Sequence, residues 1–118
     1  MTETATEQRV QSLLCQAFGA LVHAYAGVAA LHDGKEAVFA ETGNGIRVDV
    51  EGAQLELSYD PQTGIGDWHI GDHSGLNRQG HFELQSDGTV ALDGTLMEMD
   101  HAAIDLSALL KKLWGEKR

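Results

Sequence analysis

The sequence is poor in cysteine, proline and basic residues, and each shortage excludes a class of protein. It has one proline and one cysteine, Cys15, so no internal disulfide can form and a reducing compartment is favoured. Eight Lys and Arg against 18 Asp and Glu give 8 − 18 = −10. This negative field repels nucleic-acid phosphates and attracts basic proteins.

Targeting signals are also missing. The first residues contain neither the basic region nor the long apolar region of a signal peptide. No window approaches the roughly 18 consecutive apolar residues of a membrane span. We therefore predict a cytoplasmic protein that binds neither membrane nor nucleic acid.

Glycine is abundant, and ten of the 14 glycines lie between Gly43 and Gly94. Apolar and polar residues alternate between them, most clearly over residues 46–50, 55–59, 82–85 and 90–92. Turn sequences such as Glu51-Gly52 and Asp93-Gly94 separate these runs. The middle of the chain is predicted to be an antiparallel sheet of five or six strands.

Helical spacing of apolar residues brackets this sheet, from about Thr4 to Ala26 and over residues 105–114. The predicted fold is a single α+β domain over residues 1–118, with both helices on one face of the sheet. The expected contacts join Leu14, Leu21, Tyr25, Leu109 and Leu113 to Val48, Leu57, Phe82 and Val90. The opposite arc of the first helix carries Ser12, Gln16, Gly19 and His23. Cys15 is predicted to fill the core.

Two stretches of the sequence are compatible with more than one local structure. The sequence His32-Asp33-Gly34-Lys35 favours a hairpin after a helix that ends near Gly27. In the alternative, the helix continues to Leu31 and Gly34 is its C′ residue. Residues 63–79 are predicted to be a long loop or a short helix broken by glycines.

Only weak signals for chemistry occur. His69, Asp72, His73 and His81 are possible metal ligands, but the spacing of His69 and His73 requires a helix that this glycine-rich stretch does not favour. Neither nucleotide-binding glycine motif is complete, and no Gly-x-Ser-x-Gly motif occurs. The prediction is a protein without enzymatic activity, metal or cofactor.

The order of elements does resemble a family. A leading amphipathic helix precedes Val28–Gly34, Ala37–Glu41, Ile46–Val50 and Leu55–Tyr59; Phe82–Leu92 and a capped helix ending in Trp114 follow. This order resembles the small acidic chaperones of type III secretion systems. The resemblance implies a cytoplasmic α+β homodimer that holds an extended segment of a secreted protein. The family builds its dimer with a helix in the middle of the chain, where residues 63–79 here are poor helix formers.

The predicted function is therefore binding of another polypeptide, with help from an acidic rim that attracts basic partners. The residues predicted to bind the partner are Val28, Ala30, Phe39, Asp49, Glu51 and Glu56. The candidates for a homodimer interface are Trp68, Ile70 and Leu76. Three alternatives remain: a small-ligand or metal-binding domain using Trp68, His69, His73 and His81, an antitoxin-like acidic inhibitor of a basic protein, and a structural subunit.

Overall fold

The computed structural model of the chain has two helices and seven strands, and it describes residues 2–72 and 77–115. Side chains are described for residues 9–72 and 77–114. The order is α1 (Thr2–His32), β1 (Ala37–Thr42), β2 (Gly45–Val50), β3 (Ala53–Tyr59), β4 (Ile65–Gly71), β5 (Asn77–Leu84), β6 (Thr89–Leu92), β7 (Thr95–Glu98) and α2 (Met99–Gly115).

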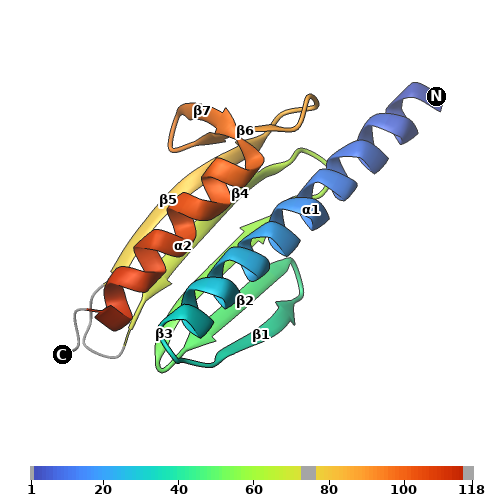
Figure 1. Cartoon of the computed structure of the whole chain (residues 1–118). Coiled ribbons are helices and arrows are strands. Elements are labelled where there is room, and N and C mark those ends of the chain that lie inside the picture. Colours follow the sequence, from blue (N-terminus) through green and yellow to red (C-terminus); the bar gives the residue numbers. More distant parts are fainter. Residues whose placement is uncertain (1, 73–76, 116–118) are drawn as a thin grey trace.

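The strands form one antiparallel sheet in the order of the chain, with β1 and β7 at its edges. Both helices lie side by side on the same face and run in the same direction (Figure 1). The N-terminal turns of α1 extend past the sheet, in keeping with a longest dimension of 55 Å (Figure 1). The predicted α+β architecture is confirmed, with seven strands instead of five or six.

Short turns make this meander possible. Glu51 (φ 51°) and Gly52 (φ 90°) join β2 to β3, and Asp93 (φ 51°) and Gly94 (φ 88°) join β6 to β7. Positive φ at both central residues gives the two-residue turn whose twist matches that of antiparallel strands. The turns predicted at these two positions are confirmed.

The hairpin predicted around Asp33-Gly34 is wrong, and the alternative is right. Helix α1 continues to His32, and Gly34 has a φ of 71°. The Lys35 N–H donates to the Ala30 carbonyl (2.8 Å), and the Gly34 N–H donates to the Leu31 carbonyl (3.0 Å). This pair of bonds is the glycine-terminated helix end known as the Schellman motif.

The irregular segment predicted over residues 63–79 is wrong where it is described. Strand β4 occupies Ile65–Gly71, and β5 begins at Asn77. Trp68 and Ile70 alternate with Asp67 and His69, but glycines obscure this pattern in the sequence. Gly66 is required because a Cβ there would lie 2.5 Å from the Phe82 ring. Residues 73–76, which include His73 and Leu76, lie outside the described part.

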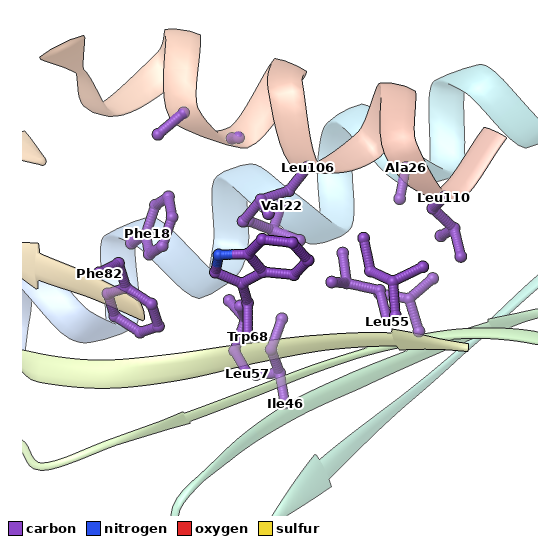
Figure 2. Packing of buried hydrophobic residues seen from close by; sticks show 14 of the residues in the cluster. Phe18, Val22, Ala26, Ile46, Leu55, Leu57, Trp68, Phe82, Leu106 and Leu110 are labelled. Atoms are coloured by element: carbon purple, nitrogen blue, oxygen red, sulfur yellow. The ribbon is translucent and has the colours of Figure 1, made fainter. Parts of the chain in front are cut away.

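The core lies between the sheet and the two helices (Figure 2). The Phe18 ring from α1 meets the Phe82 ring edge to face, with 5.2 Å between centroids. Trp68 is buried beneath the helices, and its Nε1 donates to Asp93 (3.2 Å). The C-terminal ends of the helices are joined where Trp114 Nε1 donates to Asp33 (2.8 Å).

The predicted core is correct for the sheet and partly wrong for the helices. Val48, Leu57, Phe82 and Val90 are all buried, as is Leu113 of α2. Leu14, Leu21, Tyr25 and Leu109 are only half-buried. The buried face of α1 is instead made by Cys15, Phe18, Val22, Ala26 and Ala30. Cys15 fills the core as predicted, and burial raises its pKa to about 11.

Candidate functional site

A polar pocket of about 580 Å³ lies between α1 and the β1–β2 hairpin. It is lined by Gln16, Gly19, Ala20, His23, Glu41, Thr42, Gly43, Asn44, Gly45, Ile46, Tyr59 and Pro61. Three of these, Gln16, Gly19 and His23, belong to the polar arc that the sequence assigns to the first helix. The pocket exists because the strand end that α1 crosses carries glycines and short polar side chains, which do not fill the space.

His23 is a half-buried side chain that lines the polar pocket. Its ring lies 4.8 Å from the Phe39 ring, centroid to centroid. Its Nε2 atom is buried and has no hydrogen-bond partner among the described residues. Burial lowers the pKa of His23, against the smaller opposing effects of Glu41 and the Arg47 backbone. The neutral imidazole is therefore the favoured form near pH 7.

Tyr59 and Thr42 also line this pocket. Burial raises the pKa of Tyr59, and the negative charge of Glu41 contributes in the same direction. The Thr42 Oγ1 is buried without a hydrogen-bond partner among the described residues. A buried hydroxyl or imidazole nitrogen without a partner is uncommon in folded proteins. Both atoms are closed off from solvent, so the open pocket does not reach them.

Strand β1 forms an open edge of the sheet next to this pocket. It pairs with β2 on one side, and no described residue pairs with its other side. Val38 is 61% exposed and Phe39 is 46% exposed, and their side chains point to opposite faces of the sheet. The strand contains no Lys, no Pro and no bulge, three of the devices that normally protect such an edge, and its one charged residue is Glu41.

The outer face of α1, turned away from the sheet, is apolar. It consists of the exposed residues Leu13, Ala17, Ala20, Ala24, Val28 and Leu31. No Asp, Glu, Lys or Arg occurs from Val10 to Leu31. Beside this face, an apolar groove of about 320 Å³ runs between the helices, lined by Tyr25, Val28, Ala29, His32, Ile104, Ser107, Ala108 and Lys111.

The lack of charge also bears on the prediction that no membrane span occurs. Arg9–His32 is long and apolar enough, by length and composition, to cross a membrane. The sequence contains no unbroken apolar run because Gln, Ser, Gly and His interrupt it, but no Asp, Glu, Lys or Arg occurs from Val10 to Leu31. In this structure one face of the segment is part of the core.

The face of the sheet opposite the helices is polar. The cross-strand register places Arg47 beside Glu56, Glu56 beside His69, and His69 beside Gln79. His81 Nδ1 lies 2.7 Å from Asp67 Oδ1, and both side chains are largely exposed. In the described ranges no group of three or more His, Cys, Asp or Glu side chains could hold a metal ion. His69 and His81 lie on neighbouring strands, whereas His73 is outside those ranges.

The residues predicted to bind a partner are dispersed in the structure. Val28 and Phe39 are exposed, on α1 and β1. Asp49 accepts hydrogen bonds from the Gly52 N–H (3.2 Å) and the Gln54 side chain (2.9 Å), and Glu51 pairs with Lys35 (2.5 Å). Asp49 and Glu51 therefore hold the β2–β3 turn and the end of α1, and Glu56 lies on the polar face.

Three predicted contact residues are corrected by their burial. Ala30 is fully buried in the core, so it is not accessible to a partner. Trp68 and Ile70 are 5% and 1% exposed, so they cannot form a dimer interface unless the domain rearranges. The alternation of strand β4, which the sequence analysis did not recognise, explains why both side chains point inward.

Neither the polar pocket nor the outer face of α1 was predicted from the sequence. The pocket could have been suspected from the polar arc that ends at His23 and the Thr42–Gly45 turn. The outer face could have been found from the absence of charge between Arg9 and His32. Comparison of the chain with models of protein families, with curated proteins and with solved structures finds no match.

Proposed function

We propose that the protein is a non-enzymatic, cytoplasmic module that binds an extended segment of another polypeptide along strand β1. The observation that carries the proposal is the open edge of β1, which exposes Val38 and Phe39. An added strand would gain backbone hydrogen bonds from the edge, and alternate side chains would contact the two faces.

The negative charge of the protein favours a particular kind of bound segment. The chain has a net charge of −10, and Glu36 and Glu41 flank the apolar residues of β1. Basic residues in the bound segment would therefore be favoured, chiefly through faster association. Keeping a partner's segment extended is the activity of the chaperones that the sequence resembles.

The test uses hydrogen exchange on the intact protein with extended peptides that alternate apolar and basic residues. Binding should slow amide exchange within residues 37–42, because those amides become hydrogen-bonded to the peptide. Val38→Lys, which places a charge on the open edge, should weaken binding about tenfold. Leu96→Lys on the opposite edge strand β7 is the matched control, since Leu96 is 64% exposed.

Unchanged exchange across β1 while a peptide is bound elsewhere would refute this proposal. Equal losses of affinity in Val38→Lys and Leu96→Lys would also argue against it. That result would show that added positive charge, rather than the β1 edge, weakens binding.

We also propose that the active form is a homodimer joined through the outer face of α1. The spacing of its residues suits an antiparallel copy of the same helix. Leu13 and Leu31 lie at equal distances along the chain on either side of Val22, and so do Ala20 and Ala24. Leu13 would lie opposite Leu31 of the partner subunit, and Ala20 would lie opposite Ala24 of the partner subunit. Small residues at the centre allow close approach of two helices, and such an isologous contact closes after two copies.

Solution mass by light scattering tests the dimer. The unmodified protein should have twice the mass of the chain, and Leu31→Glu should reduce it to one chain, because two carboxylates would then be buried at the interface. Leu96→Glu, with a similarly exposed leucine on β7, should remain a dimer. A monomeric unmodified protein would exclude the dimer and leave peptide binding at β1 as a separate question. Association of the unmodified protein with lipid vesicles instead would assign α1 to a membrane surface.

A further inference from the structure

An apolar groove of about 320 Å³ lies between α1 and α2, beside the outer face of α1. Ala29, Ser107 and Ala108 line it with short side chains, which leave the space open. Val28 and Ile104 also line it, and 65% and 46% of their surfaces are exposed. Contiguous exposed apolar surface marks an interaction site, whereas scattered apolar residues do not.

Two hydroxyl groups that line the groove already have hydrogen-bond partners. The Ser107 hydroxyl donates to the Ala103 carbonyl (2.8 Å), and the Tyr25 hydroxyl donates to Asp100 (3.4 Å). A group that fills the groove therefore gains little by hydrogen bonding to them. Apolar side chains match the groove best, because they bury apolar area without leaving a polar group unpaired.

A contact between the two helices shows which part of α2 is level with the C-terminal end of the outer face of α1. Lys111 Nζ lies 3.9 Å from Asp33 Oδ2. The helices run in the same direction, so Ala108, three residues before Lys111, is near the level of Leu31 (Figure 1). In the proposed antiparallel dimer, Leu13 of the partner subunit lies opposite Leu31, and therefore also at the level of Ala108.

A second copy of the chain has the charge distribution that suits this surface. Each copy has a net charge of −10, which would oppose association through most surfaces. Neither copy contributes an Asp, Glu, Lys or Arg from Val10 to Leu31, so no like charges are brought together along this contact.

The ends of the helices add an attractive contribution. The negative C-terminal ends of the α1 and α2 dipoles lie at the same end of the groove (Figure 1). An antiparallel copy brings the positive N-terminal end of its own α1 to that end. Residues 2–12 contain Glu3 and Glu7 against Arg9, whereas Lys111 and Lys112 are the only charged residues of positions 108–115. Both effects favour an antiparallel copy over a parallel one.

The surroundings of α1 determine the direction in which two such helices cross. The apolar groove lies on one flank, and the polar pocket lined by Gln16 and His23 lies on the other. A crossing toward α2 places Leu13 and Ala17 of the partner subunit over the apolar groove. A crossing toward β1 would place them over the polar pocket. Burial of apolar side chains favours the crossing toward α2.

We propose that the groove between α1 and α2 receives Leu13 and Ala17 of α1 from a second copy of this chain. This inference rests on the proposed homodimer, and it adds α2 to a contact that otherwise involves α1 alone. Because the contact is two-fold symmetric, each copy fills the groove of the other, and two grooves are closed at once.

The experiment cross-links full-length chains that each carry one added cysteine, with a short thiol-specific reagent. A mixture of Leu13→Cys and Ala108→Cys should give a cross-linked dimer, and so should a mixture of Leu13→Cys and Leu31→Cys. Leu13→Cys alone should give none, because the helix from Leu13 to Leu31 separates its two cysteines by about 27 Å. The native Cys15 is buried and is not expected to react.

Ile104→Lys and Ile65→Lys form a matched pair of variants for the strength of the dimer. Ile104 is 46% exposed at the groove, and Ile65 is 51% exposed on β4, away from both helices. Ile104→Lys should weaken dimerisation about tenfold, because its charge would lose water at the contact. Ile65→Lys, which changes the net charge equally, should leave dimerisation unchanged. Light scattering over a dilution series measures both.

The outcomes separate this inference from the proposed dimer. Cross-linking of Leu13→Cys to Leu31→Cys but not to Ala108→Cys would overturn the inference and support the dimer. Equal weakening by Ile104→Lys and Ile65→Lys would also overturn it. Absence of both cross-links would refute the dimer through α1 and this inference with it.

Discussion

The two helices cover the same face of the sheet but differ on the side that faces away from it. Helix α2 carries charges there, including Asp100, Asp105, Lys111 and Lys112. Helix α1 carries none between Val10 and Leu31, and its outer face remains apolar and exposed. Since charged residues on a free surface cost little, their absence along a whole helix face is informative. This comparison suggests that α2 is complete in one chain, whereas α1 has a second surface to cover.

Truncation of matched side chains gives the largest expected difference between the two faces of α1. Phe18→Ala should lower the free energy of unfolding by about 3–5 kcal/mol, because the ring is fully buried against Phe82. Leu31→Ala should change the stability of the monomer by less than about 0.5 kcal/mol, since Leu31 is 76% exposed. Urea unfolding at low protein concentration, where any dimer dissociates, measures both. Similar losses in the two variants would mean that both faces of α1 are packed.

The glycine that ends α1 provides the next largest effect. Gly34→Ala should destabilise the protein by about 1–2 kcal/mol, because alanine is strained at a φ of 71° although nothing obstructs its Cβ. Gly43→Ala is the control, since its Cβ meets nothing within 4 Å and its φ is not in the left-handed region. Thermal unfolding of both variants checks the prediction. An equal fall in melting temperature would mean that the helix end is not the cause.

The contact that joins the ends of the two helices should give a smaller, acid-dependent effect. The Trp114 hydrogen bond is the main reason that the pKa of Asp33 is lowered, with a further contribution from Lys111. A lowered carboxyl pKa stabilises the fold above its ordinary value of 3.8, and this stability disappears as the pH falls through the lowered value. Trp114→Phe should therefore lose less stability than the unmodified protein between pH 5 and pH 2, as measured by urea unfolding. Parallel stability curves would exclude this linkage.

His23 should give the smallest effect, at mildly acidic pH. Burial lowers its pKa below 6.5, so the unfolded chain binds a proton that the folded chain resists. Stability is therefore unaffected by His23 above about pH 6.5 and falls as the pH drops below it. The melting temperature of the unmodified protein should decline more between pH 7.5 and 5.5 than that of His23→Gln. Equal declines would assign the loss to other groups.

The sequence predicted the sheet more reliably than the long helix. Strands β2 and β3 alternate between an apolar side that must be buried and a polar side, so Val48 and Leu57 were identified as core residues from local pattern alone. Strand β4 was not recognised because Gly66 and Gly71 interrupt the pattern. The need for close approach at these two glycines is visible once Phe82 and Asn77 are placed. In α1 the apolar residues fill one broad arc, and periodicity alone could not decide that Phe18 and Val22 of this arc, instead of Leu14 and Leu21, are fully buried.

The sequence by itself determined the α+β class, the tight turns at Glu51-Gly52 and Asp93-Gly94, the amphipathic α2 and the inert burial of Cys15. These features depend on neighbouring residues, whose spacing and φ preferences act locally. Only the tertiary structure decided which face of α1 is buried, that β1 is an open edge, and that His23 and Thr42 lie around one pocket. Those outcomes depend on how α1 packs across the sheet. That packing is determined jointly by residues that are far apart in the chain.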